Sequence, residues 1–341
     1  MAEIFYKTRY YLLLTVAIVA ALCSVQSSAH EAVTPDSSAS DKFRQQTRLD
    51  ILPAGDYELE QLSAKAWIMV DGRTGNVLSQ KNSSTTLYPA SMTKMMTCIL
   101  AIESGRLNDT VEISRNAAAT AYGKVRTGER YILRDLLDVM MLVSDNGAAT
   151  AVGEFLAQIN GTSMANLMNA KAKVLQMNNS HFVNAHGLHS DDHYSTPADM
   201  MLLERYCMAN PTFAAIVRQS EKDVPLVSPA GRVRHCNNTN KLLTSYNGAV
   251  GCKTGYTRPA GGCLASCAVR DELQLFLVVM NCTPARARMA ESETLLDKGF
   301  VMAQQALAAD RRRVTSKPPV PKPAAKPHQS QKPVPERRRH H

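Results

Sequence analysis

The sequence predicts an α/β protein in which an antiparallel sheet is flanked by helices and a helical subdomain is inserted between its strands. Two observations lead to this prediction. Strand-like patterns occur towards both ends of the central part of the chain, and the residues between them have helical periodicity. The chain of 341 residues is 45% hydrophobic, which is enough to bury a large core.

The strands are predicted from apolar and β-branched runs that end at turn residues. Residues 64–70 and 76–81 should form a hairpin across an Asp-Gly-Arg-Thr-Gly turn. Three further strands are predicted at residues 250–257, 262–269 and 273–281. The last two form a hairpin rich in β-branched and apolar residues, so we expect this hairpin to lie in the centre of the sheet.

The helices are predicted where apolar residues recur every three or four positions. One helix begins after Pro89 and continues into an apolar run that should be buried on most sides. Thr196 and Pro197 have the residue types of an N-cap and a first helical position, so another helix is predicted to start there. The remaining predicted helices span residues 131–142, 148–159, 164–175 and about 290–309.

The first residues have the pattern of a secretory signal peptide. Lys7 and Arg9 precede an apolar run over residues 11–23, and Ser27-Ser28-Ala29 supplies the small residues of a cleavage site. An uncleaved membrane anchor is the alternative, but the run is shorter than the roughly 20 residues that span a bilayer. We therefore expect residues 1–29 to be a cleaved signal peptide and the protein to be exported to the periplasm or cell envelope.

The rest of the chain is predicted to contain one folded domain between two polar segments. Residues 30–60 should be a linker, residues 61–309 the folded domain, and residues 310–341 a disordered, proline-rich tail. From Arg311 onward the tail contains ten Lys or Arg residues and one acid, Glu336, and this excess equals the whole net charge of +9. We expect the tail to contact anionic membrane or wall polymers. Nucleic-acid binding is excluded by the predicted export.

Neither cysteine nor histidine spacing predicts a metal site. Removing the signal peptide reduces the eight cysteines to seven, an odd number that leaves at least one thiol free. No C-x-x-C pair occurs, so we predict no zinc site and no particular disulfide. Residues 184–193 contain three histidines and two aspartates, but they also have the composition of a polar loop before a capped helix, so we predict neither metal nor cofactor here.

A serine three residues before a lysine, at the start of a helix, is the first candidate for catalysis. Residues i and i+3 are neighbours on one helix face, so Lys94 should hold its amine beside the Ser91 hydroxyl. A serine hydroxyl is a weak nucleophile until a base takes its proton. Lys94 can be that base only if burial and a second cation keep its amine neutral.

Two other short motifs follow in order along the chain, namely Ser144-x-Asn146 and Lys253-Thr254-Gly255. Each motif is weak alone, but their contexts agree, because the first opens a helix, the second lies between helices and the third lies on a strand. With these motifs the chain resembles the serine D-alanyl-D-alanine carboxypeptidases, the low-molecular-mass penicillin-binding proteins. The resemblance covers about residues 61–300 and includes His186-Gly187-Leu188.

The resemblance implies a β-lactamase/transpeptidase-like fold and an acyl-enzyme mechanism that acts on peptidoglycan stem peptides, with penicillins as covalent inhibitors. Ser91 would attack the carbonyl between two D-alanines and pass the acyl group to water. Lys94 would be the general base, and Ser144 would relay a proton to the leaving amine.

The resemblance also implies a set of substrate-binding residues. Asn146 would hold the substrate amide, and Lys253 would be the cation that keeps the base neutral. Thr254 would bind the terminal carboxylate, while the backbone N–H groups of Ser91 and Tyr256 would form an oxyanion hole beside Gly255.

The sequence departs from the familiar pattern at two positions. Asp145 occupies the middle of the Ser-x-Asn motif, where these enzymes often have glycine. Thr239 lies between Asn238 and Asn240, where an arginine is often found, and Arg258 is a candidate to replace that arginine in carboxylate recognition.

Three alternatives to the carboxypeptidase hypothesis were considered. An endopeptidase of the same family would cut peptide cross-links, and the motifs are compatible with it. A class A β-lactamase needs a Glu-x-x-Leu-Asn segment, for which only Glu204-Arg205-Tyr206-Cys207 is available. A non-catalytic cell-wall scaffold would not need the motif residues, all of which are intact.

Overall fold

The computed structural model describes Leu59 and residues 61–315. The predicted signal peptide, nearly all of the predicted linker and most of the predicted tail lie outside the described residues. The chain divides into two units, of which the first ends at Ala303 and the second begins at Gln304. No helix in the described part of the chain combines the length and apolar character needed to cross a bilayer.

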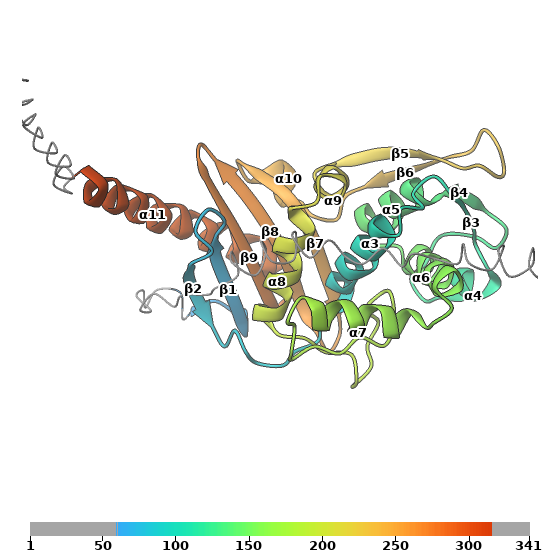
Figure 1. The fold of residues 1–341 in the computed structure, drawn as a ribbon, viewed down its shortest axis with the longest axis horizontal. Coiled ribbons are helices and arrows are strands. Elements are labelled where there is room, and N and C mark those ends of the chain that lie inside the picture. The colour runs from blue at the N-terminus through green and yellow to red at the C-terminus, as the bar shows by residue number, and fades with distance from the viewer. Residues whose placement is uncertain (1–58, 60, 316–341) are drawn as a thin grey trace, which may run out of the picture. The chain divides into compact units, whose positions relative to one another are not determined.

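The main sheet has five antiparallel strands in the order β2-β1-β9-β8-β7 (Figure 1). The first hairpin and the final three strands therefore join in one sheet, although the whole helical part of the chain separates them in sequence. The predicted hairpin of β8 and β9 is confirmed as internal, and β7 forms an edge. The strands are β1 (Ala66–Asp71), β2 (Val77–Lys81), β7 (Ala249–Thr257), β8 (Gly261–Arg270) and β9 (Leu273–Cys282).

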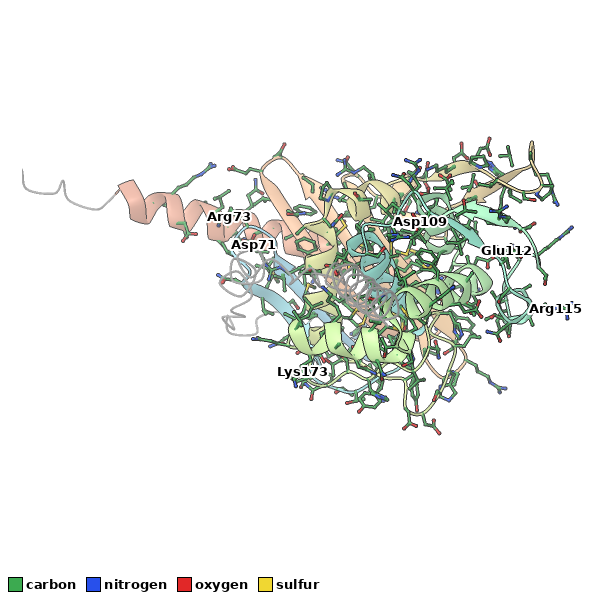
Figure 2. All side chains as sticks on the ribbon, turned by 45° about the vertical axis from the view of Figure 1, so that its right-hand side comes forward. Asp71, Arg73, Asp109, Glu112, Arg115 and Lys173 are labelled. Atoms are coloured by element: carbon green, nitrogen blue, oxygen red, sulfur yellow. The ribbon has the colours of Figure 1, made fainter. Side chains whose placement is uncertain are left out.

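The turn between β1 and β2 is closed by the carboxylate of Asp71. One of its oxygens accepts the backbone N–H of Arg73 at 2.8 Å, and the other lies 3.8 Å from the guanidinium of that residue (Figure 2). The predicted turn at this position is therefore confirmed, and the hairpin enters the sheet with β1 buried along its whole length.

The helices form a group beside the sheet, and α8 lies across the face of the sheet against β1 and β9 (Figure 1). Helix α3 is central, since it contacts α5, α6 and α8, and its side chains are almost all buried, as predicted. The helices before the last strands are η3 (Ala90–Thr93), α3 (Lys94–Glu103), α4 (Arg115–Ala119), α5 (Leu133–Leu142), α6 (Asn146–Asn160), α7 (Met164–Val174), α8 (Pro197–Met208), α9 (Pro211–Val217) and α10 (Leu242–Ser245).

Two small antiparallel pairs support the helical part. Strands β3 (Thr110–Glu112) and β4 (Arg130–Ile132) form one pair, and β5 (Glu221–Pro225) and β6 (Val233–Asn237) form the other. The first pair was not predicted, because three-residue strands are too short to show an alternating pattern.

The last helix, α11 (Ala287–Thr315), is longer than predicted. Residues 310–315 were expected to belong to the disordered tail, but they continue the helix. The segment after Ala309 contains arginines, which are good helix formers, and its first proline is Pro318, so nothing interrupts the helix at residue 310.

Gly187 illustrates how closely the loops pack around the start of η3. Its φ of +85° is unfavourable for other residues, and a Cβ atom there would lie 1.9 Å from the carbonyl oxygen of Ala90. Ala90 itself has a positive φ, +49°, so the turn that places its carbonyl oxygen against Gly187 uses a backbone conformation that is uncommon for a residue other than glycine.

We predict that Gly187→Ala lowers the free energy of unfolding by about 3 kcal/mol or more. The new side chain both strains the positive φ of residue 187 and forces the Ala90 carbonyl group to shift. Gly161→Ala is the matched control, since Gly161 also has a positive φ, +61°, but open space where its Cβ would lie. The control should lose only about 1–2 kcal/mol. Urea unfolding of both variants checks this, and equal losses would show that the contact with Ala90 has no energetic effect.

Candidate active site

Ser91 lies in the single 3₁₀ turn, Ala90–Thr93, that precedes α3. Its side chain is half-buried, while Lys94, one turn later, has no solvent exposure. The Lys94 Nζ atom lies 2.8 Å from the Ser91 Oγ atom. The pairing that the i, i+3 spacing predicted is therefore present in the structure.

Two further groups hold the Lys94 amine. Its Nζ atom lies 2.7 Å from Asn146 Oδ1, at the start of α6, and 2.8 Å from the backbone carbonyl oxygen of His186. The amide of Asn146 is oriented by its other end, because Asn146 Nδ2 donates to the carbonyl oxygen of Ala121 at 2.7 Å. Both oxygens that face the amine can only accept hydrogen bonds.

When the Lys94 amine is neutral, this arrangement determines which group donates the hydrogen bond between Lys94 and Ser91. A neutral amine has two hydrogens and one lone pair, and the two hydrogens go to Asn146 and to the His186 carbonyl. The lone pair is then left for the Ser91 hydroxyl, which donates to it. In this protonation state Lys94 is positioned as a general base for Ser91.

The surroundings of Lys94 favour the neutral amine. Complete burial lowers the pKa of Lys94 well below its ordinary value, and the nearby charge of Lys253 lowers it further. The carboxylate of Asp145 acts in the opposite direction and is the smaller effect. The two conditions expected from the sequence, burial and a second cation, are both met.

Lys253 and Thr254 lie on the edge strand β7 and are almost fully buried. Burial, and then the charge of Arg288, lower the pKa of Lys253 to about 7. The Thr254 hydroxyl lies 2.7 Å from the hydroxyl of Thr239, which is the residue found where an arginine was expected. This part of the site is therefore lined by a pair of neutral hydroxyls next to a lysine.

Gly255 allows β7 to approach η3. A Cβ atom at this position would lie 2.9 Å from the carbonyl oxygen of Pro89 and 3.2 Å from the backbone nitrogen of Ser91. The backbone of residues 255 and 256 thus lies beside the N–H of Ser91, which is the arrangement that an oxyanion hole needs. The side chain of Tyr256 is 58% exposed and lies at the rim.

Ser144 and Asp145 connect α5 to α6. Ser144 has a φ of +59°, and its hydroxyl makes no hydrogen bond in the described part of the chain. Asp145, the departure from glycine, caps α6 by accepting the N–H of Ala148 at 2.8 Å and also accepts the N–H of Lys124 at 2.7 Å. The aspartate therefore anchors a neighbouring loop to the site.

The structure thus joins the three motifs to different degrees. Ser91, Lys94 and Asn146 are linked directly by hydrogen bonds. Lys253 acts on Lys94 through its charge, and Gly255 contacts the backbone at Ser91. For Ser144, Thr254 and Tyr256, the described residues show no hydrogen bond to Ser91, and each is placed in the site by its neighbours along the chain.

Two contributors to the site were missed by motif reasoning. The His186 carbonyl was not assigned a role because a backbone group leaves no trace in residue type. Arg288 lies at the start of α11, its charge reaches Lys253, and its buried Nε atom has no hydrogen-bond partner among the described residues. No local pattern marks this arginine, because its position depends on where the last strand ends.

The loop over residues 184–193 is held by hydrogen bonds within itself and to neighbouring segments. His193 Nδ1 accepts the N–H of Val183 at 3.1 Å, which leaves Nε2–H to donate to the Thr93 hydroxyl at 2.8 Å. Burial lowers the pKa of His193 to about 3, so its ring is neutral. Within residues 61–315, no three His, Cys, Asp or Glu side chains are grouped so as to hold a metal.

Glu204, the residue that the β-lactamase hypothesis would need as a general base, lies in surroundings that do not suit that role. It is fully buried in α8 among the thiols of Cys207 and Cys252. Burial raises the pKa of Glu204 well above its ordinary value, which favours the uncharged carboxyl, a form that cannot act as a general base.

Comparison with known proteins agrees with this geometry. Residues 54–283 match the peptidase S11 family, described as D-alanyl-D-alanine carboxypeptidase. The chain belongs to the D-alanyl-D-alanine carboxypeptidase family. The resemblance inferred from the sequence motifs is therefore confirmed.

Individual members of the family cover most of this chain. The chain is 31% identical over 252 residues to D-alanyl-D-alanine carboxypeptidase DacF of Bacillus subtilis. The aligned region covers 70% of this chain and 62% of that relative. The chain is also 31% identical to DacB2 of Mycobacterium tuberculosis, with 75% and 89% covered. The chain thus spans less than two thirds of the length of the Bacillus relative.

The fold agrees with a solved structure from the same group. The Streptomyces K15 DD-transpeptidase superposes with a TM-score of 0.67 at 27% identity, over 73% of this chain and 100% of that chain. The predicted transpeptidase-like fold, an antiparallel sheet flanked by helices, is confirmed.

We predict that the rate of acylation by a small penicillin rises with pH as Lys94 loses its proton, with a midpoint well below the ordinary lysine range. Lys253→Gln removes the neighbouring cation, so the pKa of Lys94 should rise and the midpoint should move to higher pH. Lys253→Arg keeps the charge and should restore most of the shift. Stopped-flow acylation measured from pH 5 to 10 checks this, and an unmoved midpoint in the glutamine variant would contradict it.

Proposed function

We propose that this protein is a serine D-Ala-D-Ala carboxypeptidase that removes the terminal D-alanine from peptidoglycan stem peptides. The observation that carries the proposal is the buried Lys94 amine, whose two hydrogens are bound elsewhere and whose lone pair faces Ser91. Membership of the D-alanyl-D-alanine carboxypeptidase family supports the choice of substrate.

The first half of the reaction forms the acyl-enzyme. Ser91 Oγ attacks the carbonyl carbon between the two D-alanines while its proton passes to Lys94 Nζ. The negative charge that develops on the carbonyl oxygen is bound by the N–H groups of Ser91 and Tyr256. The C–N bond then breaks, and the departing amine takes up the proton held by Lys94, relayed through the Ser144 hydroxyl, which releases D-alanine and returns Lys94 to its neutral form.

The second half reverses the roles with water as the nucleophile. Water gives its proton to the neutral Lys94 amine and attacks the ester carbon, and the bond to Ser91 Oγ breaks as that oxygen regains a proton. Glu204 is assigned no part in this step, because it is fully buried and burial favours its uncharged form. Penicillins should form the same ester, and the acyl-enzyme should be long-lived.

The terminal carboxylate is assigned to the Thr254 end of the site. The hydroxyls of Thr254 and Thr239 can both donate to it, and Lys253 supplies charge from within the strand. We assign the guanidinium of Arg288 to this carboxylate as well, in place of the Arg258 suggested by sequence. Its Nη1 donates to the Ala285 carbonyl oxygen at 2.8 Å, but its Nε has no partner among the described residues, and Arg288 is the cation whose field reaches Lys253.

We predict that the purified protein forms a stable penicillin adduct and releases D-alanine from a pentapeptide ending in D-Ala-D-Ala. Ser91→Ala should abolish both activities, and Lys94→Ala should slow acylation by about 1,000-fold or more while the fold remains intact. Intact-mass analysis and a D-alanine assay check this. An adduct without D-alanine release would favour the endopeptidase, rapid drug turnover the β-lactamase, and no adduct would refute the assignment.

We further propose that the protein is exported to the cell envelope and that its basic tail strengthens attachment to anionic membrane or wall polymers. The support is compositional, since the ten basic residues from Arg311 onward carry the net charge. A chain without residues 311–341 should bind membranes and isolated sacculi more weakly, and only the full chain should be released by salt. Equal, salt-independent retention of both forms would rule out this role.

A further inference from the structure

A basic cleft lies where the loop after α4 meets the β5–β6 hairpin. It has a volume of about 140 Å³ and is lined by four cationic side chains, one acid and two apolar residues: Lys124, Arg126, Glu129, Leu226, Arg232, Val233 and Arg234. None of these residues belongs to the motifs that the proposed reaction uses.

One of the four cations is already neutralised and forms the floor of the cleft. Arg234 Nη2 lies 3.0 Å from Glu129 Oε2, and the same carboxylate oxygen accepts the Tyr131 hydroxyl at 2.9 Å and the N–H of Arg126 at 3.0 Å. Arg234 Nε donates to the Tyr131 oxygen at 3.0 Å. Glu129 Oε2 therefore carries all three contacts, and the single negative charge of Glu129 is balanced by Arg234, while Oε1 is buried without a hydrogen-bond partner among the described residues.

The remaining three cations leave an excess of positive charge at the mouth of the cleft. Lys124, Arg126 and Arg232 are exposed, and none of them forms an ion pair within the described part of the chain. Three like charges around a small concave surface repel one another, so an anion bound between them would relieve that repulsion and gain charge-assisted hydrogen bonds.

Both walls of the cleft are attached to the active site. The N–H of Lys124 is bound to Asp145, and the carbonyl of Ala121 is bound to Asn146, so the loop is fixed to the Ser-x-Asn motif. The opposite wall, β6, continues directly to Thr239, whose hydroxyl meets Thr254. The cleft is therefore connected to the segment that positions Asn146, the residue expected to hold the substrate amide on the acyl side.

We infer that the cleft binds a carboxylate carried by the substrate on the acyl side of the scissile bond. The inference rests on the proposed function and adds a second anionic recognition point to it. The cleft is large enough for a carboxylate on a short side chain, and its guanidinium groups suit the two oxygens of such a group. The terminal carboxylate is excluded as the occupant because it is assigned to the Thr254 end.

The test uses two pairs of synthetic peptides ending in D-Ala-D-Ala. The members of a pair differ only in a free carboxylate or its carboxamide, placed one residue before the D-alanines in the first pair and two residues before them in the second. We expect at least one pair to show about a tenfold higher kcat/KM for the carboxylate at low salt, and the ratio should fall as salt rises.

The double variant Arg126→Gln/Arg232→Gln should reduce this ratio to about one. The ratio compares two peptides on the same protein, so a general loss of activity cancels. The matched control is Arg115→Gln/Lys173→Gln, which also removes two positive charges, from α4 and α7, outside the cleft (Figure 2). The control should keep the wild-type ratio. A ratio near one for both pairs in the wild type, or an unchanged ratio in the double variant, would overturn the inference.

A second readout separates this inference from the proposed function. The same peptides are tested as competitors of penicillin acylation at Ser91, which requires binding but no D-alanine release. The carboxylate peptide should protect Ser91 at about tenfold lower concentration than its carboxamide partner. Protection without D-alanine release would refute the carboxypeptidase proposal and leave the cleft supported, whereas D-alanine release with equal protection by both partners would do the opposite.

Discussion

The burial of one lysine amine is the constraint on which the rest of this site depends. Lys94 has no solvent exposure, so its charged form loses hydration that nothing in its surroundings fully replaces. The two fixed acceptors, Asn146 Oδ1 and the His186 carbonyl, suit an amine with two hydrogens. The protein thus stabilises the basic form of the residue by leaving its lone pair a single neighbour, the Ser91 hydroxyl.

Keeping that amine buried requires four segments that are far apart in the sequence to lie next to one another in the fold. The start of α3, the start of α6, the loop at His186 and the edge strand β7 all contribute, and two glycines allow the contacts. Gly187 lies against the Ala90 carbonyl and Gly255 against Pro89 and Ser91, where a Cβ atom would not fit. The helical part and the sheet therefore meet at Ser91.

The sequence predicted the fold class, the central hairpin and the serine–lysine pair because these features depend on local rules. Periodicity identifies α5 and β9, and the i, i+3 spacing places Lys94 beside Ser91. Features that depend on tertiary position could not be predicted in this way. The His186 carbonyl has no residue signature, and Arg288 reaches Lys253 only through the path of the chain after β9.

The seven cysteines of the described chain have a consequence for how the folded state can be followed. All are buried, and burial raises the pKa of each, to about 11 for Cys236 and Cys263, for example. Thiolates are the reactive species in alkylation and disulfide exchange, so the native protein is protected twice, by exclusion of reagent and by suppression of the anion. Thiol modification then reports opening of the structure, and an odd number of thiols can persist without cross-linking folded molecules.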